Sequence, residues 1–451
     1  MQKRLLSLGL VVLLALMVGT VGAQDDVDPT GATIMYWHEW DGAQGEGITA
    51  VIDMFNESNE WGITVEQNPL GGSSDVRSNV STGITSGELP NLAGAGFVTD
   101  AMGYYLDGVL VPFDQFIDSD WGFSDEEAAD LNFNIIDTNR PAISPFDGQL
   151  LAWPIGVSAE VMSTNIDLLA EMSEAGLIDF EGAPTTFEQF SAAACAASEL
   201  EGVTAGLAGR PTGSELYSFI LNFGGDVFDA EADAYTFTNE GAVEAMQYLQ
   251  DLYNDGCMYY ADGGNFANTG EFSLGLNVFA IGSSVGVPFI QGDMESAELD
   301  YNWINTTVPW TEGNRTVVSS LRGVTMFEST PEENLATWLF VKYWATNPEA
   351  QAIWTESAQY QPYNVATPAN LSADFLAENA QFASFADVLA DPEINVITFP
   401  AHPRAFDVSL VAGELYSNIT IGGMDIMEAA AVAEEEANAI YQEDLENIAD
   451  A

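Results

Sequence analysis

Basic residues are scarce in this sequence. Among its 451 residues, 9 are Lys or Arg and 69 are Asp or Glu. Lys3 and Arg4 precede residue 24 and no acidic residue does, so the rest of the chain carries a net charge of 7 − 69 = −62. A field of this sign repels nucleic acid and anionic membrane surfaces. We therefore expect no nucleic-acid partner and no stable membrane insertion.

Histidine is rarer still, because His38 and His402 are the only two. Neither lies at the spacing of a catalytic triad or a zinc site, which argues against hydrolase and metallohydrolase mechanisms. Residues 228–237 contain alternating carboxylates that faintly resemble a calcium loop, but they lack its central Gly and distal Glu. An exposed hairpin is the favoured interpretation of that segment. We expect no metal site and no other cofactor.

Cysteine is also rare, and the chain contains just Cys195 and Cys257. In an oxidising compartment such a pair is expected to form a disulfide. Cys195 falls within a predicted helix and Cys257 lies just beyond the end of another. The bridge would therefore join two neighbouring helices.

Long apolar runs are absent beyond the first 23 residues. There, Lys3 and Arg4 precede an apolar run from Leu5, and residues 21–23 (VGA) form a suitable cleavage site. Residues 1–23 are thus predicted to be a secretory signal peptide. No Cys near this site suggests a lipid anchor, and no later segment is long enough to span a bilayer. We expect an exported protein, periplasmic or extracellular.

Predicted strands alternate with predicted helices in the first hundred residues. A strand-like run from Thr33 to Trp37 leads into a loop rich in Trp, Asp and Gly. A helix follows, in which apolar residues recur every three or four positions. Two further strands, 63–67 and one ending near Phe97, flank a helix at 75–86. This alternation predicts an α/β fold with parallel strands, and the length allows two or three domains.

Ligands of such folds collect in the loops beyond the carboxyl ends of the strands. The first loop offers Trp40, Asp41 and Gln44, which are a ring and polar groups suited to a sugar. Asp100 follows the third strand. Two alternatives stay open at this point, because Trp40 could be a core residue and Asp100 could cap a helix.

Short motifs recur in a fixed order along the rest of the chain. They are WHEW (37–40), FNE (55–57), SGELPN (86–91), GVLVPFD (108–114), LAWP (151–154), PTTFE (184–188), FAIGS (279–283), WLFVKYW (338–344), NPE (347–349) and QP (361–362). Their order and spacing resemble the extracellular solute-binding proteins of ABC importers, family 1. The resemblance covers nearly the whole chain beyond the predicted signal peptide.

The resemblance implies a two-lobed periplasmic-binding-protein fold, in which each lobe is a mainly parallel sheet flanked by helices. We expect residues 24–145 and 320–361 in lobe 1, and residues 146–319 and 362–451 in lobe 2, with hinge crossings between them. The ligand would bind in the cleft and favour closure of the lobes, which a membrane permease would recognise. The expected function is capture of a sugar for an ABC importer by a monomer, without catalysis.

The resemblance also implies which residues bind the ligand. Aromatic rings would cover the apolar faces of a pyranose, and carboxylates would accept hydrogen bonds from its hydroxyls. Each aromatic has the alternative of an ordinary core position, and Arg322 would pair with an acidic sugar or, as we favour, with a neighbouring Asp. Ser158 stands where the family has an acid, which leaves its hydrogen bonding open. The predicted set is Trp40, Asp41, Gln44, Asp100, Trp153, Ser158, Tyr217, Ser283, Ser284, Trp310, Arg322 and Tyr360.

Three other function classes compete with this interpretation. A secreted carbohydrate-active enzyme would need two carboxylates at a fixed separation, and no motif singles out such a pair. A ferric-ion binder could use Tyr259 and Tyr260 but lacks supporting His, and a surface adhesin fits the charge but not the two-lobed pattern. The sequence does not distinguish a mono- from an oligosaccharide, or a sugar from a polyol.

Overall fold

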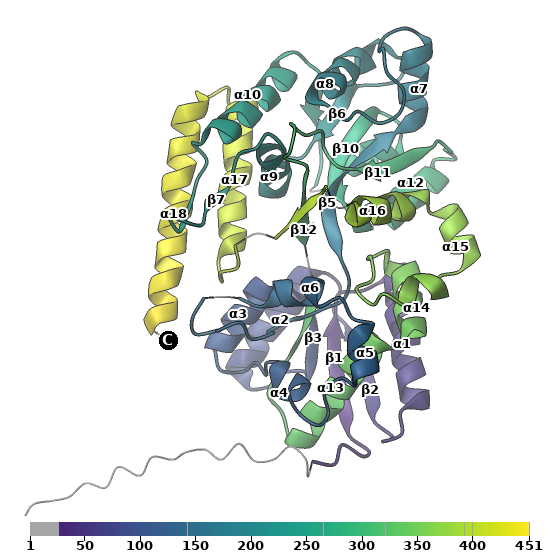
Figure 1. Cartoon of the computed structure of the whole chain (residues 1–451), viewed down its shortest axis with the longest axis vertical. Helices are drawn as coiled ribbons and strands as arrows, with labels where there is room; N and C mark the ends of the chain where they lie inside the picture. The colour runs from purple at the N-terminus through teal and green to yellow at the C-terminus, as the bar shows by residue number, and fades with distance from the viewer. Residues whose placement is uncertain are drawn as a thin grey trace, which may run out of the picture.

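The computed structural model describes residues 27–450 except residues 142, 265, 321, 392 and 399. The predicted signal peptide therefore lies outside the described residues. The chain forms two lobes, one above the other in Figure 1, and each lobe is built around its own sheet. This arrangement confirms the predicted two-lobed α/β fold. Among the described residues, no helix is both long and apolar enough to cross a membrane.

Lobe 1 contains a five-stranded sheet in the order β2-β1-β3-β13-β4. β1 pairs in parallel with β2 and β3, whereas β13 runs antiparallel to both β3 and β4. Its elements are β1 (Thr33–His38), α1 (Gly42–Ser58), β2 (Thr64–Pro69), α2 (Ser73–Ser86), β3 (Leu92–Gly96), α3 (Val98–Leu106), α4 (Asp114–Ile117), α5 (Asp125–Ala129), α6 (Phe133–Ile136), η2 (Asp137–Asn139), β4 (Trp153–Pro154), β13 (Gly323–Met326), α13 (Pro331–Thr346), α14 (Pro348–Ala358) and η5 (Thr367–Asn370).

Lobe 2 contains a larger sheet in the order β14-β12-β5-β10-β6-β9, with β11 also paired to β5. Its parallel pairs are β10–β6, β6–β9 and β12–β14, and the strands paired with β5 run antiparallel to it. Its elements are β5 (Ser158–Asn165), α7 (Ile166–Glu174), α8 (Phe187–Ala196), η3 (Ala197–Glu199), β6 (Ala205–Gly209), α9 (Gly213–Asn222), β7 (Phe228–Asp229), β8 (Ala234–Tyr235), α10 (Glu240–Asn254), β9 (Met258–Tyr260), α11 (Ala267–Ser273), β10 (Asn277–Ser283), η4 (Ser284–Gly286), α12 (Val287–Ser296), β11 (Trp303–Thr306), β12 (Thr316–Ser320), α15 (Ala373–Glu378), α16 (Ala380–Ala390), β14 (Asn395–Ile397), α17 (Ala405–Thr420) and α18 (Ile426–Asp450).

The opening strand–helix unit forms as the sequence predicts. Along β1, Ile34 and Tyr36 are buried and alternate with less buried neighbours, which is the period of a strand with one face on the core. On α1, Ile48, Val51 and Phe55 share one buried face at helical spacing. Each such side chain stabilises the fold by about 1.5 to 3 kcal/mol on burial, so this unit anchors lobe 1.

The chain passes between the lobes at three places. The first crossing joins β4 to β5, and the second joins β12 to β13. The third leads from η5 to α15; shortly before it, the backbone of Gln361 pairs with Val157 and the side-chain amide of Gln361 donates to the carbonyl of Phe382, 2.9 Å away. Neighbouring crossing segments therefore hydrogen-bond to one another at the hinge.

The lobe boundaries differ from those predicted at residues 146 and 362. Trp153 and Ile155 belong to the core of lobe 1, and β4 is the edge strand of its sheet. Tyr363 packs in the same core. Residues 146–155 and the segment 362–370 are thus assigned to lobe 1, because Trp153, Ile155 and Tyr363 are buried in its core and η5 packs against α14. Sequence motifs mark the crossings but not which core receives each side chain.

Helix α18 connects both lobes at the side of the molecule (Figure 1). It packs along α17 in lobe 2, where Glu434 accepts hydrogen bonds from the backbone of Phe237 and Thr238. At its far end Ile448 is buried against Ala101 and Met102 of lobe 1. The last turns of α18 therefore add an apolar contact between the lobes outside the crossings.

Cys195 and Cys257 form a disulfide, which confirms the predicted bridge. It joins the last turn of α8 to Cys257, three residues after the end of α10. The predicted exposed hairpin at residues 228–237 is the two-stranded β7–β8 ribbon.

Every basic residue beyond the predicted signal peptide forms an ion pair. The pairs are Arg77 with Asp100, Arg140 with Asp114 and Asp137, Arg210 with Glu160, Arg315 with Asp391, Arg322 with Glu39, Lys342 with Glu127, and Arg404 with Asp407 and Glu443. These seven cations neutralise a small part of the acidic charge, so repulsion among the remaining carboxylates opposes the compact state.

Raising the salt concentration should therefore stabilise the protein. Between about 10 mM and about 1 M salt the Debye length falls from about 30 Å to about 3 Å, which screens this repulsion more than it weakens seven local pairs. We expect the melting temperature, followed by circular dichroism, to rise across this range. An equal rise in a non-ionic osmolyte such as sucrose would instead indicate solvent exclusion, and a fall with salt would contradict the argument.

Removing the disulfide should destabilise lobe 2. The bridge closes a loop with a sequence separation of 62 residues, for which the loss of chain entropy in the unfolded state corresponds to about 4 kcal/mol. The double variant Cys195→Ser/Cys257→Ser should therefore unfold at lower urea than the oxidised protein. The reduced wild type is the matched control and should behave like the variant. Unchanged midpoints would show that the bridge adds no net stability.

Candidate ligand-binding cleft

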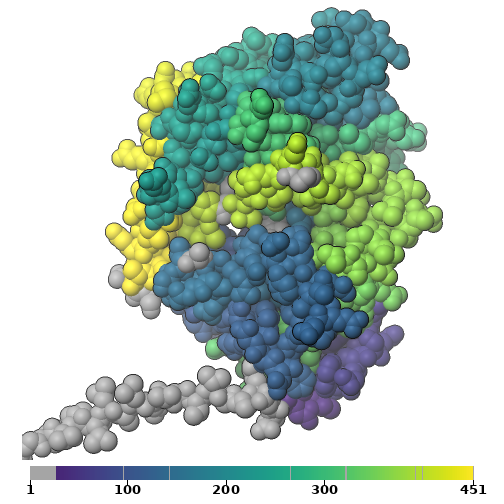
Figure 2. Space-filling view, in the orientation of Figure 1, coloured from purple at the N-terminus to yellow at the C-terminus, as the bar shows by residue number. Residues whose placement is uncertain are grey.

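The facing edges of the two sheets are defined by the crossings. In lobe 1 the start of β13 pairs with Gly96, so β3 and its parallel neighbour β1 end at the edge that faces lobe 2. In lobe 2, Ser283 at the end of β10 pairs with Glu160 near the start of β5, so β10 and β6 end facing lobe 1. Figure 2 shows the surface hollowed between lobe 1 and the α16–α17 region of lobe 2. Loops after parallel strands of both lobes therefore meet in one cleft.

On the lobe 1 side, an ion pair between Glu39 and Arg322 dominates the edge. Glu39 follows β1, and its Oε1 lies 3.0 Å from Nη1 of Arg322, which also donates to Oγ of Ser73 at 2.9 Å. The guanidinium lies 5.5 Å from the centre of the Phe97 ring. The Glu39 carboxylate fits here because residue 94 is glycine: a Cβ there would lie 2.8 Å from Oε2.

The Glu39 side chain is only 5% exposed. Burial raises the pKa of its carboxyl group, and the charge of Arg322 opposes that rise. Its Oε2 atom is buried and has no hydrogen-bond partner among the described residues. The pairing of Arg322 with a protein carboxylate agrees with the alternative that the sequence favoured, although the partner is a Glu and not an Asp.

The first loop keeps two of its predicted ligand-binding residues accessible. Asp41 is exposed at the start of α1 and makes no capping hydrogen bond, and Gln44 is half-buried one turn later. Trp40 is 4% exposed, and its ring packs edge-on against Trp354 and Tyr360. For Trp40 the structure therefore favours the alternative of a core residue.

Asp100 serves the structure of lobe 1. Its two oxygens lie 3.0 and 3.1 Å from Nε and Nη2 of Arg77, and Oδ2 also accepts a hydrogen bond from the backbone of Phe97 at 2.9 Å. Asp100 thus caps α3, as the capping alternative held, but it does so from the first turn of the helix rather than from the N-cap position.

Three more predicted aromatic residues lie in the cores. Trp153 is 1% exposed, and its indole donates to the hydroxyl of Tyr363 at 2.9 Å. Tyr360 stacks on Trp354 in lobe 1, and Tyr217 stacks on Phe237 in lobe 2. Burial raises the pKa of Tyr360 to about 12. The structure therefore offers none of these rings to a ligand.

Trp310 lies apart from the other predicted residues. It precedes the start of β12, which is the end of that strand remote from the crossing. Arg315 covers one face of its half-buried ring, with the guanidinium carbon 4.2 Å from the ring centre. Arg315 in turn pairs with Asp391. This stack stabilises a loop of lobe 2.

The three predicted serines lie at the hinge. Ser284 Oγ accepts a hydrogen bond from the backbone of Ala159 at 3.2 Å, and the carbonyl of Ser158 accepts one from Oγ of Ser319 at the same distance. Both residues are buried and hold the crossing strands together. Ser283, by contrast, is exposed at the end of β10.

Sequence reasoning missed the lobe 2 counterpart of the Glu39–Arg322 pair. Arg210 directly follows β6, and its Nη2 lies 2.5 Å from Oε1 of Glu160 on β5. The backbone N–H of Arg210 donates to Glu215, which is fully buried and also accepts from the hydroxyl of Tyr416. Burial raises the pKa of Glu215 to about 8. The available signal was a rare basic residue immediately after an apolar strand.

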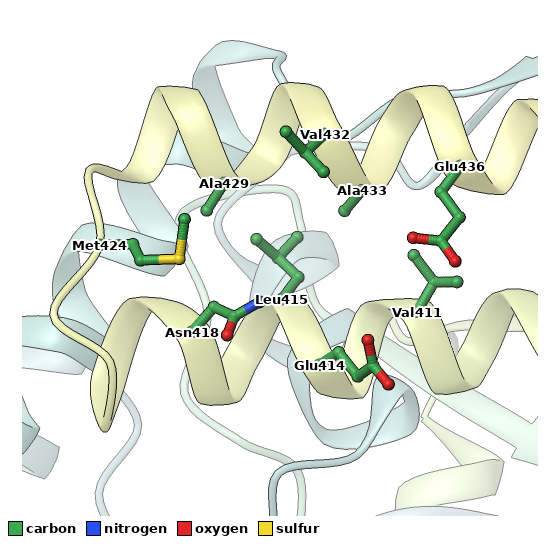
Figure 3. A pocket seen from close by; sticks show the side chains of 9 residues that line it. All are labelled: Val411, Glu414, Leu415, Asn418, Met424, Ala429, Val432, Ala433 and Glu436. Atoms are coloured by element: carbon green, nitrogen blue, oxygen red, sulfur yellow. The ribbon is translucent and has the colours of Figure 1, made fainter.

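A small hollow between α17 and α18 is a different feature (Figure 3). Its lining is mostly aliphatic, from residues such as Leu415 and Val432, and two carboxylates, Glu414 and Glu436, lie at one end. It is a groove between packed helices and lacks polar groups that converge on a ligand.

The ferric-ion alternative finds no support in the geometry. Tyr259 donates to Glu271, whereas Tyr260 is bonded to Thr420, so the two hydroxyls have different partners. Among the described residues no group of three His, Cys, Asp or Glu is placed to hold a metal ion.

Comparison with known proteins identifies the family. A sequence profile of bacterial extracellular solute-binding proteins matches residues 50–384. The chain belongs to this family. The predicted resemblance is thereby confirmed, and the protein is a binding protein rather than the carbohydrate-active enzyme considered above. A comparison with curated proteins found no match.

Solved structures of similar fold come from several bacteria. The cyclic α-maltosyl-1,6-maltose binding protein of Arthrobacter globiformis is 20% identical, with a TM-score of 0.72 over 91% of this solute-binding protein and 98% of that chain. The Listeria monocytogenes ABC substrate-binding protein Lmo0181, in complex with cycloalternan, is 17% identical (TM-score 0.73; 91% and 99% covered). UgpB of Mycobacterium tuberculosis, in complex with glycerophosphocholine, is 16% identical (TM-score 0.73; 92% and 99% covered). At these identities the likeness concerns the fold.

Breaking the Glu39–Arg322 pair should destabilise lobe 1 of the solute-binding protein. Arg322→Met leaves a buried carboxylate without its cation, which costs about 3 to 5 kcal/mol for a fully buried pair; because Arg322 is 29% exposed, we expect about 1 to 3 kcal/mol. The double variant Glu39→Gln/Arg322→Met should recover part of this loss in urea unfolding. Additive effects of the two substitutions would contradict the direct coupling.

Proposed function

We propose that this chain is the substrate-binding component of an ABC importer, and that it captures an uncharged sugar in the cleft and delivers it to a membrane permease. Contacts to both lobes exist only when the lobes close, so binding shifts the population towards the closed form. In this proposal, residues 1–23 are a signal peptide that directs export of the protein, which acts as a monomer. Of the predicted set, we retain Asp41, Gln44, Ser283 and Arg322 as proposed ligand contacts, and the support for them is that their side chains are exposed or partly exposed.

One observation carries the proposal that the ligand is uncharged. Two cations at the facing edges, Arg322 and Arg210, are each already paired with a carboxylate, and so is Arg77, whose guanidinium lies 5.7 Å from the centre of the same Phe97 ring as that of Arg322. A phosphate or carboxylate on the ligand would have to compete with Glu39 or Glu160 for them, in a protein of strongly negative charge. Hydroxyl groups, which donate to carboxylates and accept from guanidinium, fit both pairs without such competition.

The names of the structural neighbours support a carbohydrate. Two of the three described above are named for, or were solved with, a cyclic oligosaccharide, and a further neighbour is the maltose-bound MalE3 of Thermotoga maritima, at 17% identity and a TM-score of 0.71. UgpB differs from these, because it was solved with glycerophosphocholine. Phosphodiesters of this kind are therefore the competing class of ligand.

A ligand panel tests the proposal. The protein without residues 1–23 should be titrated with maltose, maltotriose, a cyclic glucan, glycerophosphocholine and glucose 1-phosphate, with thermal shift and calorimetry as readouts. At a sugar concentration of about 100 times Kd, stabilisation should reach about 2.7 kcal/mol. We expect a shift with at least one neutral sugar, none with glucose 1-phosphate, and recovery of the sugar intact by mass spectrometry. Cleavage of the sugar, or binding of the phosphate compounds alone, would overturn the proposal.

A further inference from the structure

We propose that Phe266, Arg210 and Glu160 form the lobe 2 wall of the sugar site, with Phe266 as the platform for a pyranose ring. This inference rests on the function proposed above and names the residues that would select a neutral sugar. None of the three belongs to the set predicted from the sequence.

The three side chains come from separate elements that meet at the cleft edge of lobe 2. Glu160 lies on β5 opposite Ser283, Arg210 follows the end of β6, and Phe266 immediately precedes α11. The guanidinium carbon of Arg210 is 5.8 Å from the centre of the Phe266 ring. Val285, two residues beyond Ser283, packs against the core of lobe 1, which shows that this edge faces the other lobe.

Two features of this cluster suggest that a ligand completes it. Phe266 is 65% exposed, the largest exposure of any large apolar side chain among the described residues, and the guanidinium of Arg210 lies beside its ring. Nε of Arg210 is buried and has no hydrogen-bond partner in the described part of the chain, even though Nη2 is paired with Glu160. The unpaired buried N–H of Arg210 is costly in isolation, and an exposed ring beside it is useful in a binding site.

The backbone around Arg210 is held rigidly. Buried Glu215 accepts the N–H of Arg210 at 2.9 Å and the hydroxyl of Tyr416 at 3.1 Å. The backbone of Arg210 is therefore held in place, and the ion pair with Glu160 orients its guanidinium group. Such preorganisation lowers the entropy lost on binding, so these contacts position Arg210 without touching a ligand themselves.

The chemistry of the cluster selects a neutral, ring-shaped polyol. An apolar face of a pyranose would cover Phe266, while vicinal hydroxyls would donate to Glu160 and accept from Arg210. An anionic group would be repelled by Glu160, and a cationic group by Arg210. The wall therefore favours a sugar over both phosphorylated solutes and polyamines.

Substitutions at Phe266 test the platform. With the tightest neutral sugar of the panel, Phe266→Ala should raise Kd about tenfold by calorimetry, because the ring stack and its buried area are lost. Phe266→Trp should keep the affinity within about threefold, since an indole also offers a flat apolar face, and its emission should change on adding sugar. Glu160→Gln should raise Kd about tenfold by removing the charge-assisted hydrogen bond.

The matched control is Leu274→Ala. Leu274 is also an exposed apolar residue next to α11, but it follows the opposite end of that helix, close to the start of β10 and away from lobe 1. Its substitution should leave Kd unchanged. Equal melting temperatures of the unliganded variants would exclude a general folding defect.

The outcomes separate this inference from the proposed function. If neutral sugars bind and Phe266→Ala matches Leu274→Ala in affinity, the platform is refuted and the sugar-binding function stands. If no neutral sugar stabilises the wild-type protein, the proposed function fails and the platform with it. If Phe266→Ala weakens every ligand, glycerophosphocholine included, by the same factor, the inferred selection of neutral sugars is wrong.

Discussion

The cleft depends on the hydrogen-bonded crossings that hold the two sheets edge to edge. The chain enters lobe 2 as β5, which pairs antiparallel with β10, and it returns to lobe 1 as β13, which pairs antiparallel with β3. Because each crossing strand enters its sheet from the other lobe, the carboxyl ends of the parallel strands in both lobes point at the same gap. The cleft, and every residue assigned to it, follows from this pairing of strands.

Two lobes with separate cores, joined by a few crossing segments, determine how the molecule can move. Each lobe buries its own apolar core, so the lobes can move as bodies. The contacts between them include the crossing segments, a hydrogen bond from Gln359 to Asn379, Val285 on lobe 1, and Ile448 at the end of α18. When the lobes close, the contacts of Val285 and Ile448 with lobe 1 must either shift or break. The balance between open and closed forms therefore depends on these small apolar contacts as well as on the ligand.

The electrostatics of this chain is determined by its small number of basic residues. With seven cations against 69 acids beyond the predicted signal peptide, each cation is committed to a carboxylate, and two of those pairs lie at the facing edges of the lobes. Charge-assisted hydrogen bonds in a cleft of limited water are strong, which gives an acidic protein polar recognition without unpaired charge. The same scarcity makes the surface repel anions generally, and ligand selection then depends on shape and hydroxyl groups.

The sequence by itself determined the fold class, the family and the disulfide, because period, motif order and cysteine count are local or one-dimensional properties. It also placed Asp41 and Gln44 in the loop after the first strand, since such loops can be read from the chain, and the family resemblance added Ser283 and Arg322. It did not separate Trp40, Trp153, Tyr217 and Tyr360 from ligand contacts, because a core and a sugar site select the same rings and only three-dimensional packing distinguishes them. Tertiary structure alone decided that Glu39 meets Arg322 and Glu160 meets Arg210, because those partners lie 283 and 50 residues apart and are brought together by the order of the strands within each lobe's sheet.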